Sequence, residues 1–462
     1  MTPGLIRLAV IGHTNAGKTS LLRTVLRDRE FGLVSSRPGT TRQVAAVQVD
    51  LGEGCCLELV DTPGLEDSMG LLDALHAGGF DPREPGGARL ARWLATAVAE
   101  AEFAQEAKAL RQLLAADLAL FVIDAREPVI GKYEDEFTLL AGAGKPCLVV
   151  LNFVAMPAAQ PAAWRAALQR AGLFNVTSFD TVVFEAAEEA RLLQQVALLL
   201  PSAAAHCERL RVLRDAERAT QRTLGAALIA AMLLDCAAWR APLDGAGASP
   251  LASRILARER RLVADLLRLF GFAEADYVNQ PPPVVGALWR FDPFDPATLK
   301  ELGLELALAA AKGAAYGVVI DIATLGHTLG LGALLGGVIG AGVDAATRFN
   351  GQLRDAWTGQ RYAQLAPTAA LFLARRACVL AGDLARRGHA AVSPLAARTA
   401  LARALPGEDQ IAEALAACAR HPAWSALGAA PAPGDRRRHA TLLALETALS
   451  VALRDPTATP LD

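Results

Sequence analysis

A glycine-rich segment near the start of the chain has the composition of a phosphate-binding loop. Residues 12–19 fit the pattern GxxxxGK[ST], between a predicted strand over 5–11 and a predicted helix over 17–26. In such a loop, backbone N–H groups and the helix N-terminus bind phosphate oxygens. Lys18 would reach the β- and γ-phosphates, and the Thr19 hydroxyl would bind Mg²⁺. The nucleotide-binding residues expected here are Gly12, His13, Thr14, Asn15, Ala16, Gly17, Lys18, Thr19 and Ser20.

Two short motifs after this loop fit Mg²⁺-dependent phosphate chemistry. Asp61-Thr62-Pro63-Gly64 follows a predicted strand over 56–60. An aspartate at a strand end can hold Mg²⁺ through water, and the Gly64 N–H can sense a γ-phosphate. Between the two motifs lies the sequence RPGTTR, residues 37–42, where a threonine can add its hydroxyl to the metal. Either motif is weak alone, but their order after the phosphate loop indicates a nucleoside-triphosphate site.

These segments resemble the translation-factor-related GTPases, especially the Era/TrmE-like branch. The matching stretches are GHTNAGKTSLL, RPGTTR, DTPGLED and FVIDAREP, within roughly residues 5–200. The resemblance implies a GTPase that binds GTP and GDP, with Thr41 as the switch I threonine. It places Mg²⁺ at Thr19, Thr41 and Asp61. The residues it assigns to hydrolysis are Lys18, Thr41, Gly64 and Asn15.

The residue after Gly64 departs from the Ras-type pattern. Ras-type enzymes have a glutamine there that orients the attacking water, whereas this chain has Leu65, which has no hydrogen-bonding group. Hydrolysis therefore needs another source of positive charge in the transition state. In the TrmE-like branch an asparagine at the position of Asn15 coordinates K⁺, which implies slow hydrolysis that K⁺ accelerates more than Na⁺. The alternative is that Asn15 only caps the loop.

The guanine-reading motif is incomplete. The family pattern Asn-Lys-x-Asp is replaced by Asn152-Phe153-Val154-Ala155 after the predicted strand over 147–151. Asn152 is in place and is expected to tie the base loop to the phosphate loop. Ala155 removes the carboxylate that would accept two hydrogen bonds from guanine, and an unpaired polar edge costs about 1–3 kcal/mol. We favour GTP because the switch motifs are of the GTPase kind, while ATP or promiscuous purine triphosphate binding stays open.

The order of the predicted elements indicates an α/β domain over 1–200. Short apolar runs alternate with helical patterns, which is typical of a mostly parallel sheet with helices on both faces. Residues 65–117 exceed a switch loop plus one helix, so we expect an extended switch II region there; the alternative is a long packing helix. An antiparallel edge pair is expected between 44–51 and 56–60. The remaining strands are expected at 5–11, 118–123, 147–151 and 176–184.

An all-α domain is predicted over 201–462, where strand signals disappear. Together with the first half, it makes the chain resemble a bacterial family of GTPases fused to a C-terminal domain of unknown function. Its predicted helices lie at 202–240, 251–272, 298–347, 352–388, 394–405, 408–420 and 436–454.

One part of that domain could contact a membrane. Residues 322–343 carry no formal charge and are long enough to cross a bilayer, and 302–347 could form a helical hairpin. Their GxxxG spacings permit close helix contact. The hairpin could therefore insert into a membrane, pack in the core of a helical domain, or form a homo-oligomer contact.

The composition limits the function classes. The charge sum of 46 Lys+Arg against 48 Asp+Glu gives −2, which offers no basic field for nucleic acid, and no clear nucleic-acid signature is present. Hydrophobic residues make up 53% and charged residues 20%, which excludes bulk disorder. Seven cysteines without a CxxC pair predict reduced thiols. We expect a cytoplasmic protein, with the inner face of the cell membrane as the second location.

These features together predict a GTP-binding conformational switch with slow Mg²⁺-dependent hydrolysis. Nucleotide state would reposition 65–117 against the helical domain. The alternative is a nucleotide-gated scaffold that scarcely hydrolyses and acts by oligomerising, and RNA-linked assembly is a third interpretation.

Overall fold

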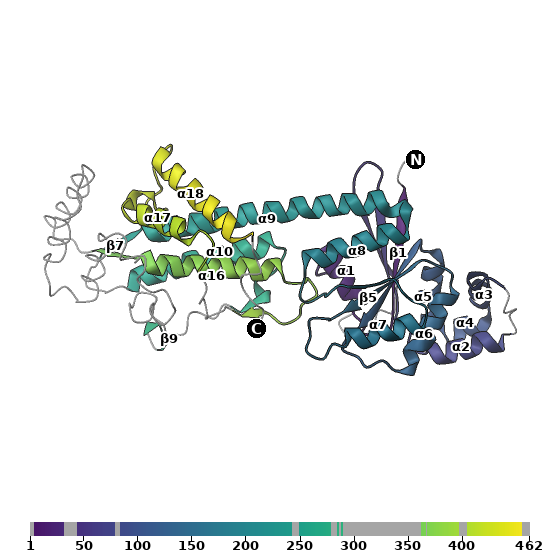
Figure 1. Cartoon of the computed structure of the whole chain (residues 1–462). Helices are drawn as coiled ribbons and strands as arrows, with labels where there is room; N and C mark the ends of the chain where they lie inside the picture. The colour runs from purple at the N-terminus through teal and green to yellow at the C-terminus, as the bar shows by residue number, and fades with distance from the viewer. Residues whose placement is uncertain are drawn as a thin grey trace, which may run out of the picture. The chain divides into compact units, whose positions relative to one another are not determined.

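The computed structural model describes residues 4–31, 44–78, 84–242, 249–278, 284–285, 288–289, 362–365, 367–396 and 404–454 (Figure 1). The predictions for Thr41 and its loop over 37–42, and for the helix over 298–347 with its glycine-rich stretch 322–343 and hairpin 302–347, lie outside the described residues. The chain divides into two compact units. The first holds residues 1–218 and 386–392, and the second holds 219–385 and 393–462.

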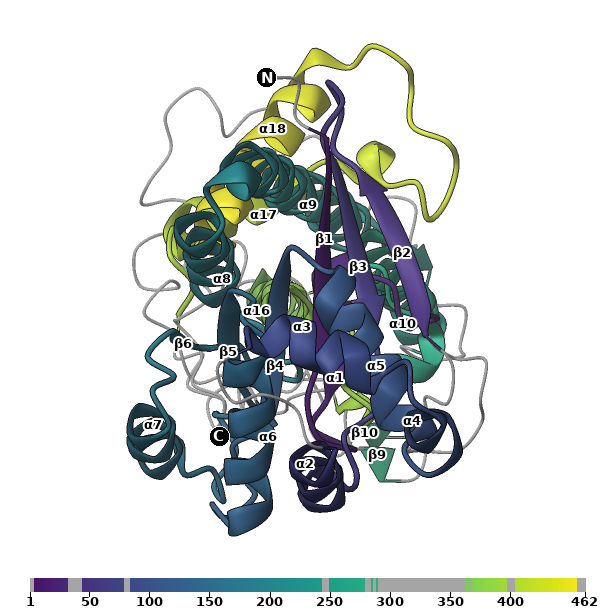
Figure 2. The same cartoon turned by 90° about the vertical axis from the view of Figure 1, so that its right-hand side faces the viewer.

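A six-stranded sheet of order β2-β3-β1-β4-β5-β6 forms the centre of the first unit, as Figure 2 shows. Strand β2 pairs antiparallel with β3, and the other neighbours are parallel. Strand β4 is buried along its whole length, as expected where helices cover both faces. The predicted α/β class and the antiparallel edge pair are confirmed. The strands are β1 (Leu5–Ile11), β2 (Ala45–Asp50), β3 (Cys56–Asp61), β4 (Leu118–Asp124), β5 (Cys147–Asn152) and β6 (Val176–Ser178).

Helices cover both faces of this sheet and enclose two apolar cores. On one face Phe121 of β4 packs edge-on against Phe137, with ring centroids 5.9 Å apart, and Trp164 is fully buried nearby. On the other face Leu21 and Leu192 fill the core, where each buried leucine contributes about 1.5–3 kcal/mol. The helices of this unit are α1 (Lys18–Leu26), α2 (Ser68–Ala77), α3 (Gly86–Trp93), α4 (Ala97–Ala101), α5 (Ala104–Ala115), α6 (Gly131–Gly142), α7 (Pro161–Arg170), α8 (Ala186–Leu199) and the start of α9 (Ala204–Ala238).

The extended region between β3 and β4 contains four helices, α2 to α5, where the alternative interpretation was one long helix. The break after α3 has a local cause, because the Thr96 hydroxyl accepts the Ala99 N–H and starts α4 in a new direction. Within this region Trp93 and Phe103 are buried, whereas Val98 is 42% exposed.

The last strand of the sheet is shorter than predicted. Strand β6 ends at Ser178, although the apolar pattern continues to 184. The carboxylate of Asp180 accepts the N–H groups of Val182 and Val183 and folds the chain into a turn. The strand predicted over 176–184 is therefore wrong beyond 178.

Helices dominate the described part of the second unit, which confirms the predicted class. Its core includes Leu233 of α9, Leu266, Phe372 and Leu445. Residues 395–396, predicted as the start of a helix, instead form a short strand. The helices are α10 (Ser249–Leu269), α16 (Pro367–Ala385), α17 (Glu408–Ala419) and α18 (Arg436–Ala452). Short strand pairs join β7 (Arg240–Pro242) with β11 (Tyr362–Gln364), β8 (Tyr277–Val278) with β12 (Leu395–Ala396), and β9 (Val284–Val285) with β10 (Leu288–Trp289).

Within the described residues, the helical stretch Pro201–Ala238 passes a length and hydropathy test for a membrane span. Its most apolar window is 61% buried inside the protein. A buried core helix that does not cross a membrane satisfies the same length and hydropathy criteria. All seven cysteines are free thiols in this structure.

Candidate functional site

The phosphate-binding loop connects the end of β1 to α1. In the sheet β1 lies between β3 and β4, so the chain continues on one side of β1 with β3 and then crosses to the other side with β4. In sheets of this kind ligands bind beyond the carboxyl ends of the strands, at such a change of side. The loop needs left-handed backbone at Asn15 (φ 65°) and Gly17 (φ 92°). Glycine is required at 17 for a second reason, because a Cβ there would collide with Nδ2 of Asn152.

Lys18 is buried at the first position of α1. Its Nζ donates hydrogen bonds to the carbonyl oxygens of Gly12 (3.0 Å) and His13 (2.8 Å). Burial lowers the pKa of Lys18 to about 8. Because a buried ammonium lacks full solvation, an anionic phosphate at this loop would stabilise its charged form. The carboxylates that partly oppose the pKa shift are Asp61, Glu136 and Glu66.

Thr19 and Asp61 meet beside this lysine, as their motifs predicted. The Thr19 hydroxyl donates to Oδ2 of Asp61 at 2.6 Å. Asp61 is fully buried, and its Oδ1 has no hydrogen-bond partner among the described residues. Burial raises the pKa of Asp61, against the Thr19 hydrogen bond and the Lys18 charge. A buried carboxylate oxygen without a partner, next to a hydroxyl, fits the hard oxygen ligands that Mg²⁺ takes.

The start of switch II lies directly on the phosphate loop. Gly64 is so close to Thr14 that a Cβ would collide with the Thr14 backbone. The Leu65 N–H donates to the Gly12 carbonyl at 3.2 Å, and the Thr14 hydroxyl donates to Glu66 at 3.1 Å. The Leu65 side chain is fully buried in the apolar core. It therefore cannot orient a water, as its chemistry already indicated.

A carboxylate from the extended region fixes the backbone of switch II. Glu106 of α5 is 6% exposed, and its Oε1 accepts the N–H groups of Glu66 (3.3 Å) and Asp67 (3.2 Å). Asp67 in turn caps α2 by accepting the Gly70 N–H at 2.8 Å. Glu106 was not predicted as a functional residue from the sequence. The one indication in the sequence is an acidic residue beside the buried positions of a predicted helix.

The side chain of His13 points into helix α6, where its Nδ1 lies 2.9 Å from Oε1 of Glu136. Its backbone carbonyl is the part that contacts Lys18. Ser20 lies in the first turn of α1. Asn15 is exposed and has a left-handed backbone, with φ of 65°.

Asn152 ties the base loop to the phosphate loop, as predicted. Its Nδ2 donates to the Ala16 carbonyl at 3.2 Å, and its Oδ1 accepts the Thr181 N–H at 3.1 Å. The Ala155 N–H donates to Oδ2 of Asp180 at 3.0 Å. Asp180, which the sequence analysis missed, thus places a carboxylate against the position where the motif lacks one.

An aromatic ring with a cation on its face completes the base side. Phe153 has a left-handed backbone, with φ of 58°, and its ring carries the guanidinium of Arg126 4.0 Å from the centroid. Asp124 holds this guanidinium through both carboxylate oxygens and also accepts the Arg126 N–H. The Phe153 side chain is buried, with 9% of its surface exposed.

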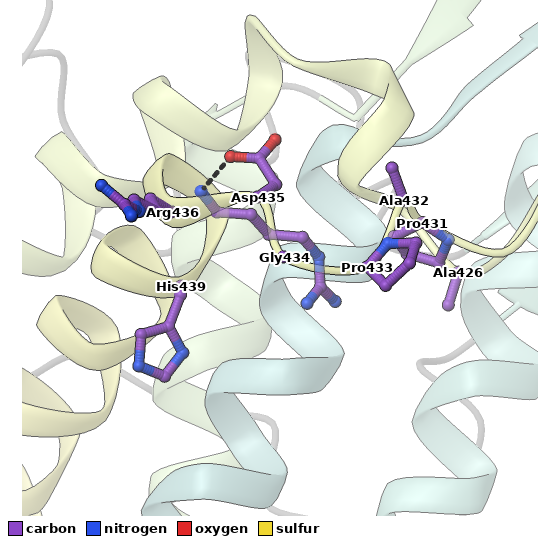
Figure 3. Close-up of a pocket in the computed structure, with 9 residues that line it drawn as sticks. Ala426, Pro431, Ala432, Pro433, Gly434, Asp435, Arg436 and His439 are labelled. Carbon is purple, nitrogen blue, oxygen red and sulfur yellow. Dashed lines mark hydrogen bonds between the residues drawn. The ribbon is translucent and has the colours of Figure 1, made fainter.

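A cavity of about 570 Å³ lies at the start of α18, away from the phosphate-binding loop in the sequence (Figure 3). Asp435 accepts the N–H groups of Arg437 and Arg438 there, so the helix N-terminus already has its anion. We assign it no ligand. Among the described residues, no cluster of three or more His, Cys, Asp or Glu side chains could hold a metal ion.

Comparison with known proteins finds two family models along the chain. The family described as "50S ribosome-binding GTPase" matches residues 7–153, and the family described as "Domain of unknown function (DUF3482)" matches residues 165–447. The tRNA modification GTPase MnmE of Heliobacterium modesticaldum is 30% identical over 146 residues, 32% of this chain and 24% of that protein. GTPase Der of Symbiobacterium thermophilum is 31% identical over 149 residues, 32% of this chain and 26% of that protein.

The chain thus spans about a quarter of the length of these curated relatives. Among solved structures, a variant of Era from Aquifex aeolicus bound to GDP·AlF4⁻ is similar at 19% identity and a TM-score of 0.31, over 43% of this chain and 57% of that chain. The model of the domain of unknown function covers more than half of the sequence. The protein therefore belongs to the DUF3482 family and carries a P-loop GTPase domain before that region.

Proposed function

We propose that this protein binds GTP at residues 12–19 and hydrolyses it slowly with Mg²⁺, as a conformational switch. The observation that carries the proposal is the buried pair of Thr19 and Asp61, whose Oδ1 is unpartnered within the described residues, beside the buried Lys18. Beside the N-terminus of α1, the Lys18 ammonium would neutralise negative charge on the phosphates. The Thr19 hydroxyl and the Asp61 carboxylate would bind the Mg²⁺ ion.

The hydrolysis step follows from what these residues can do. Thr19 and Asp61 would hold the metal, which would neutralise charge on the β- and γ-phosphates. Lys18 would bind the same oxygens, while the N–H groups of the loop fix the phosphate tail. Leu65 offers no group to orient the attacking water, because its side chain is buried in the core. We therefore propose slow hydrolysis.

A monovalent cation at Asn15 would supply the missing positive charge. Asn15 is exposed next to the phosphate-binding residues, where its side-chain oxygen could reach a K⁺ ion beside the phosphates. The simpler alternative, that Asn15 only shapes the loop, is supported by its left-handed backbone, which asparagine tolerates well.

Switching would begin at the contacts between switch II and the phosphate loop. Binding of a γ-phosphate at the Gly64 N–H would compete with the present bond from the Leu65 N–H to Gly12. Any shift of Glu66 would pass to α5, because Glu106 holds the Glu66 backbone. The extended region of residues 65–117 would therefore move with nucleotide state.

Membrane contact through 302–347, homo-oligomer formation and a location at the inner face of the cell membrane remain proposals that rest on the sequence pattern alone. The alternative function, a nucleotide-gated scaffold, shares the same site and differs in turnover. The tRNA modification named for the MnmE relatives is not extended to this chain, since it matches about a quarter of them.

The experiment is phosphate release from GTP by the full-length protein with Mg²⁺, in K⁺ and in Na⁺ at equal ionic strength. We expect slow turnover that is faster in K⁺, lost in Lys18→Ala, and reduced to the Na⁺ level in Asn15→Ala. Binding without turnover in either salt would favour the scaffold. Equal rates in both salts, with Asn15→Ala unchanged, would remove the K⁺ proposal.

A further inference from the structure

Helix α6 reaches the phosphate loop through His13. The imidazole Nδ1 lies 2.9 Å from Oε1 of Glu136, and its Nε2 lies 3.0 Å from Nζ of Lys132. A lysine ammonium can only donate, so Nε2 must accept and Nδ1 must carry the proton that Glu136 accepts. The ring also meets Tyr133 edge-on, with centroids 5.6 Å apart. Three residues of one helix therefore fix the orientation of a single loop side chain.

Glu136 is an unusual residue to bury at this place. It is fully buried, and its second oxygen, Oε2, has no hydrogen-bond partner among the described residues. Burial raises the pKa of Glu136, while the hydrogen bond from His13 and the charges of Lys18 and Lys132 favour the carboxylate. A buried carboxylate is costly, and apolar residues of similar volume often stabilise a fold at least as well. The cost points to a role beyond stability.

The backbone of His13 is where this contact would act on the nucleotide. Its carbonyl accepts Nζ of Lys18 at 2.8 Å and the Ala16 N–H at 3.3 Å. The residue also forms a bridge with Leu65 at the start of switch II. Holding the ring in α6 therefore fixes a peptide unit that contacts both the phosphate-binding lysine and switch II.

Helix α6 is itself tied to switch II. The Ser68 hydroxyl, at the start of α2, donates to the Lys132 carbonyl at 3.0 Å. The same turn of α6 thus contacts the phosphate loop through its side chains and switch II through its backbone. A displacement of α2 on γ-phosphate binding would reach His13 through this turn.

We propose that Glu136 is a positioning residue for the triphosphate, acting through the imidazole of His13 to hold the phosphate loop in its binding shape. The inference rests on the proposed function, because it concerns the same nucleotide. Glu136 does not touch the nucleotide. Its effect is on how well the loop N–H groups and Lys18 are arranged before the phosphates arrive, which sets affinity more than turnover.

The test compares two substitutions of Glu136 in the full-length protein. Glu136→Gln keeps an oxygen that accepts the Nδ1 proton, and Glu136→Leu removes it with little change in volume. Affinity for GDP and GTP is measured by calorimetry, and KM and kcat by phosphate release. We expect Glu136→Leu to weaken binding and to raise KM by about tenfold or more, the effect of losing a hydrogen bond to a charged group. We expect kcat to change by less than about threefold.

The Gln variant separates positioning from charge. If Glu136 acts by holding His13, Glu136→Gln restores affinity to within about threefold of the unaltered protein. If Glu136→Gln binds nucleotide as weakly as Glu136→Leu, the carboxylate acts on Lys18 through its charge, and the proposal is overturned. Glu189→Gln is the matched control, because Glu189 is also a buried carboxylate, 3% exposed, but binds Arg218 of α9. It should leave nucleotide affinity unchanged.

A second route keeps the test decisive if Glu136→Leu fails to fold. His13→Ala removes the other partner and should weaken binding by a similar factor. Unchanged affinity in a folded His13→Ala variant would contradict a role through His13. If the unaltered protein binds no guanine nucleotide, the proposed function fails. If it binds and a folded Glu136→Leu binds equally well, only this inference fails.

Discussion

The pH dependence of nucleotide affinity follows from the burial of Lys18. Burial lowers the pKa of Lys18 to about 8 from an ordinary 10.5. This pKa shift corresponds to a free-energy penalty of about 3 kcal/mol on the charged form of Lys18, and the attraction of the ammonium to phosphate must offset that penalty. At pH 7 about nine in ten free molecules carry the ammonium, and at pH 9 about one in ten do. Because phosphate binds the charged form, binding takes up a proton above pH 8, and affinity falls with rising pH.

The expected magnitude is a loss of about tenfold in GDP affinity between pH 7 and pH 9. The measurement is calorimetric titration at constant ionic strength in buffers of different ionisation enthalpy, which also counts the protons taken up. Lys18→Arg is the control, because a guanidinium stays charged over this range and its affinity should be flat with pH.

Two results would refute this reasoning. An affinity that stays constant from pH 7 to pH 9 in the unaltered protein would mean that Lys18 is charged throughout. A decline of equal size in Lys18→Arg would assign the pH dependence to another group.

Three further perturbations have expected outcomes. Asp61→Asn should raise the Mg²⁺ concentration for half-maximal GTP binding by about tenfold, because it removes a charged oxygen; an unchanged Mg²⁺ titration would contradict the metal assignment. Glu106→Ala should free the backbone of switch II, so hydrogen exchange at the Glu66 and Asp67 amides should speed up; protection equal to that of the unaltered protein would rule out the clamp. Leu21→Ala, at a fully buried site, should lower the free energy of unfolding in urea by about 3 kcal/mol; a loss below about 1 kcal/mol would contradict its place in the core.

The parts of the site that the sequence predicted are those that strand ends bring together. Asp61 is the last residue of β3, and Thr19 lies in α1, which the phosphate loop connects to the neighbouring parallel strand β1, so topology brings them together at the carboxyl ends of the strands. Asn152 is the last residue of β5 at the same end of the sheet and reaches Ala16 for the same reason. Apolar runs and short motifs are sufficient for such predictions, because each motif lies next to the strand that places it.

The carboxylates that the sequence did not reveal come from helices. Glu136 and Glu106 lie within helices with no motif around them, and Glu136 is 123 positions from its partner His13. Their contacts depend on how α5 and α6 pack, which helical periodicity does not specify. Asp180 was hidden inside an apolar run predicted as strand, and its side-chain bonds to Val182 and Val183 overrode that pattern.

The central claim is that a guanine nucleoside triphosphate binds at the phosphate loop through Lys18. The most direct measurement is calorimetric titration of GTP with Mg²⁺ into nucleotide-free, full-length protein, alongside Lys18→Ala. We predict binding at one site per chain that weakens about a hundredfold in Lys18→Ala, with ATP binding more weakly than GTP. No heat with either GTP or ATP from folded protein, or equal affinity in Lys18→Ala, would contradict the account.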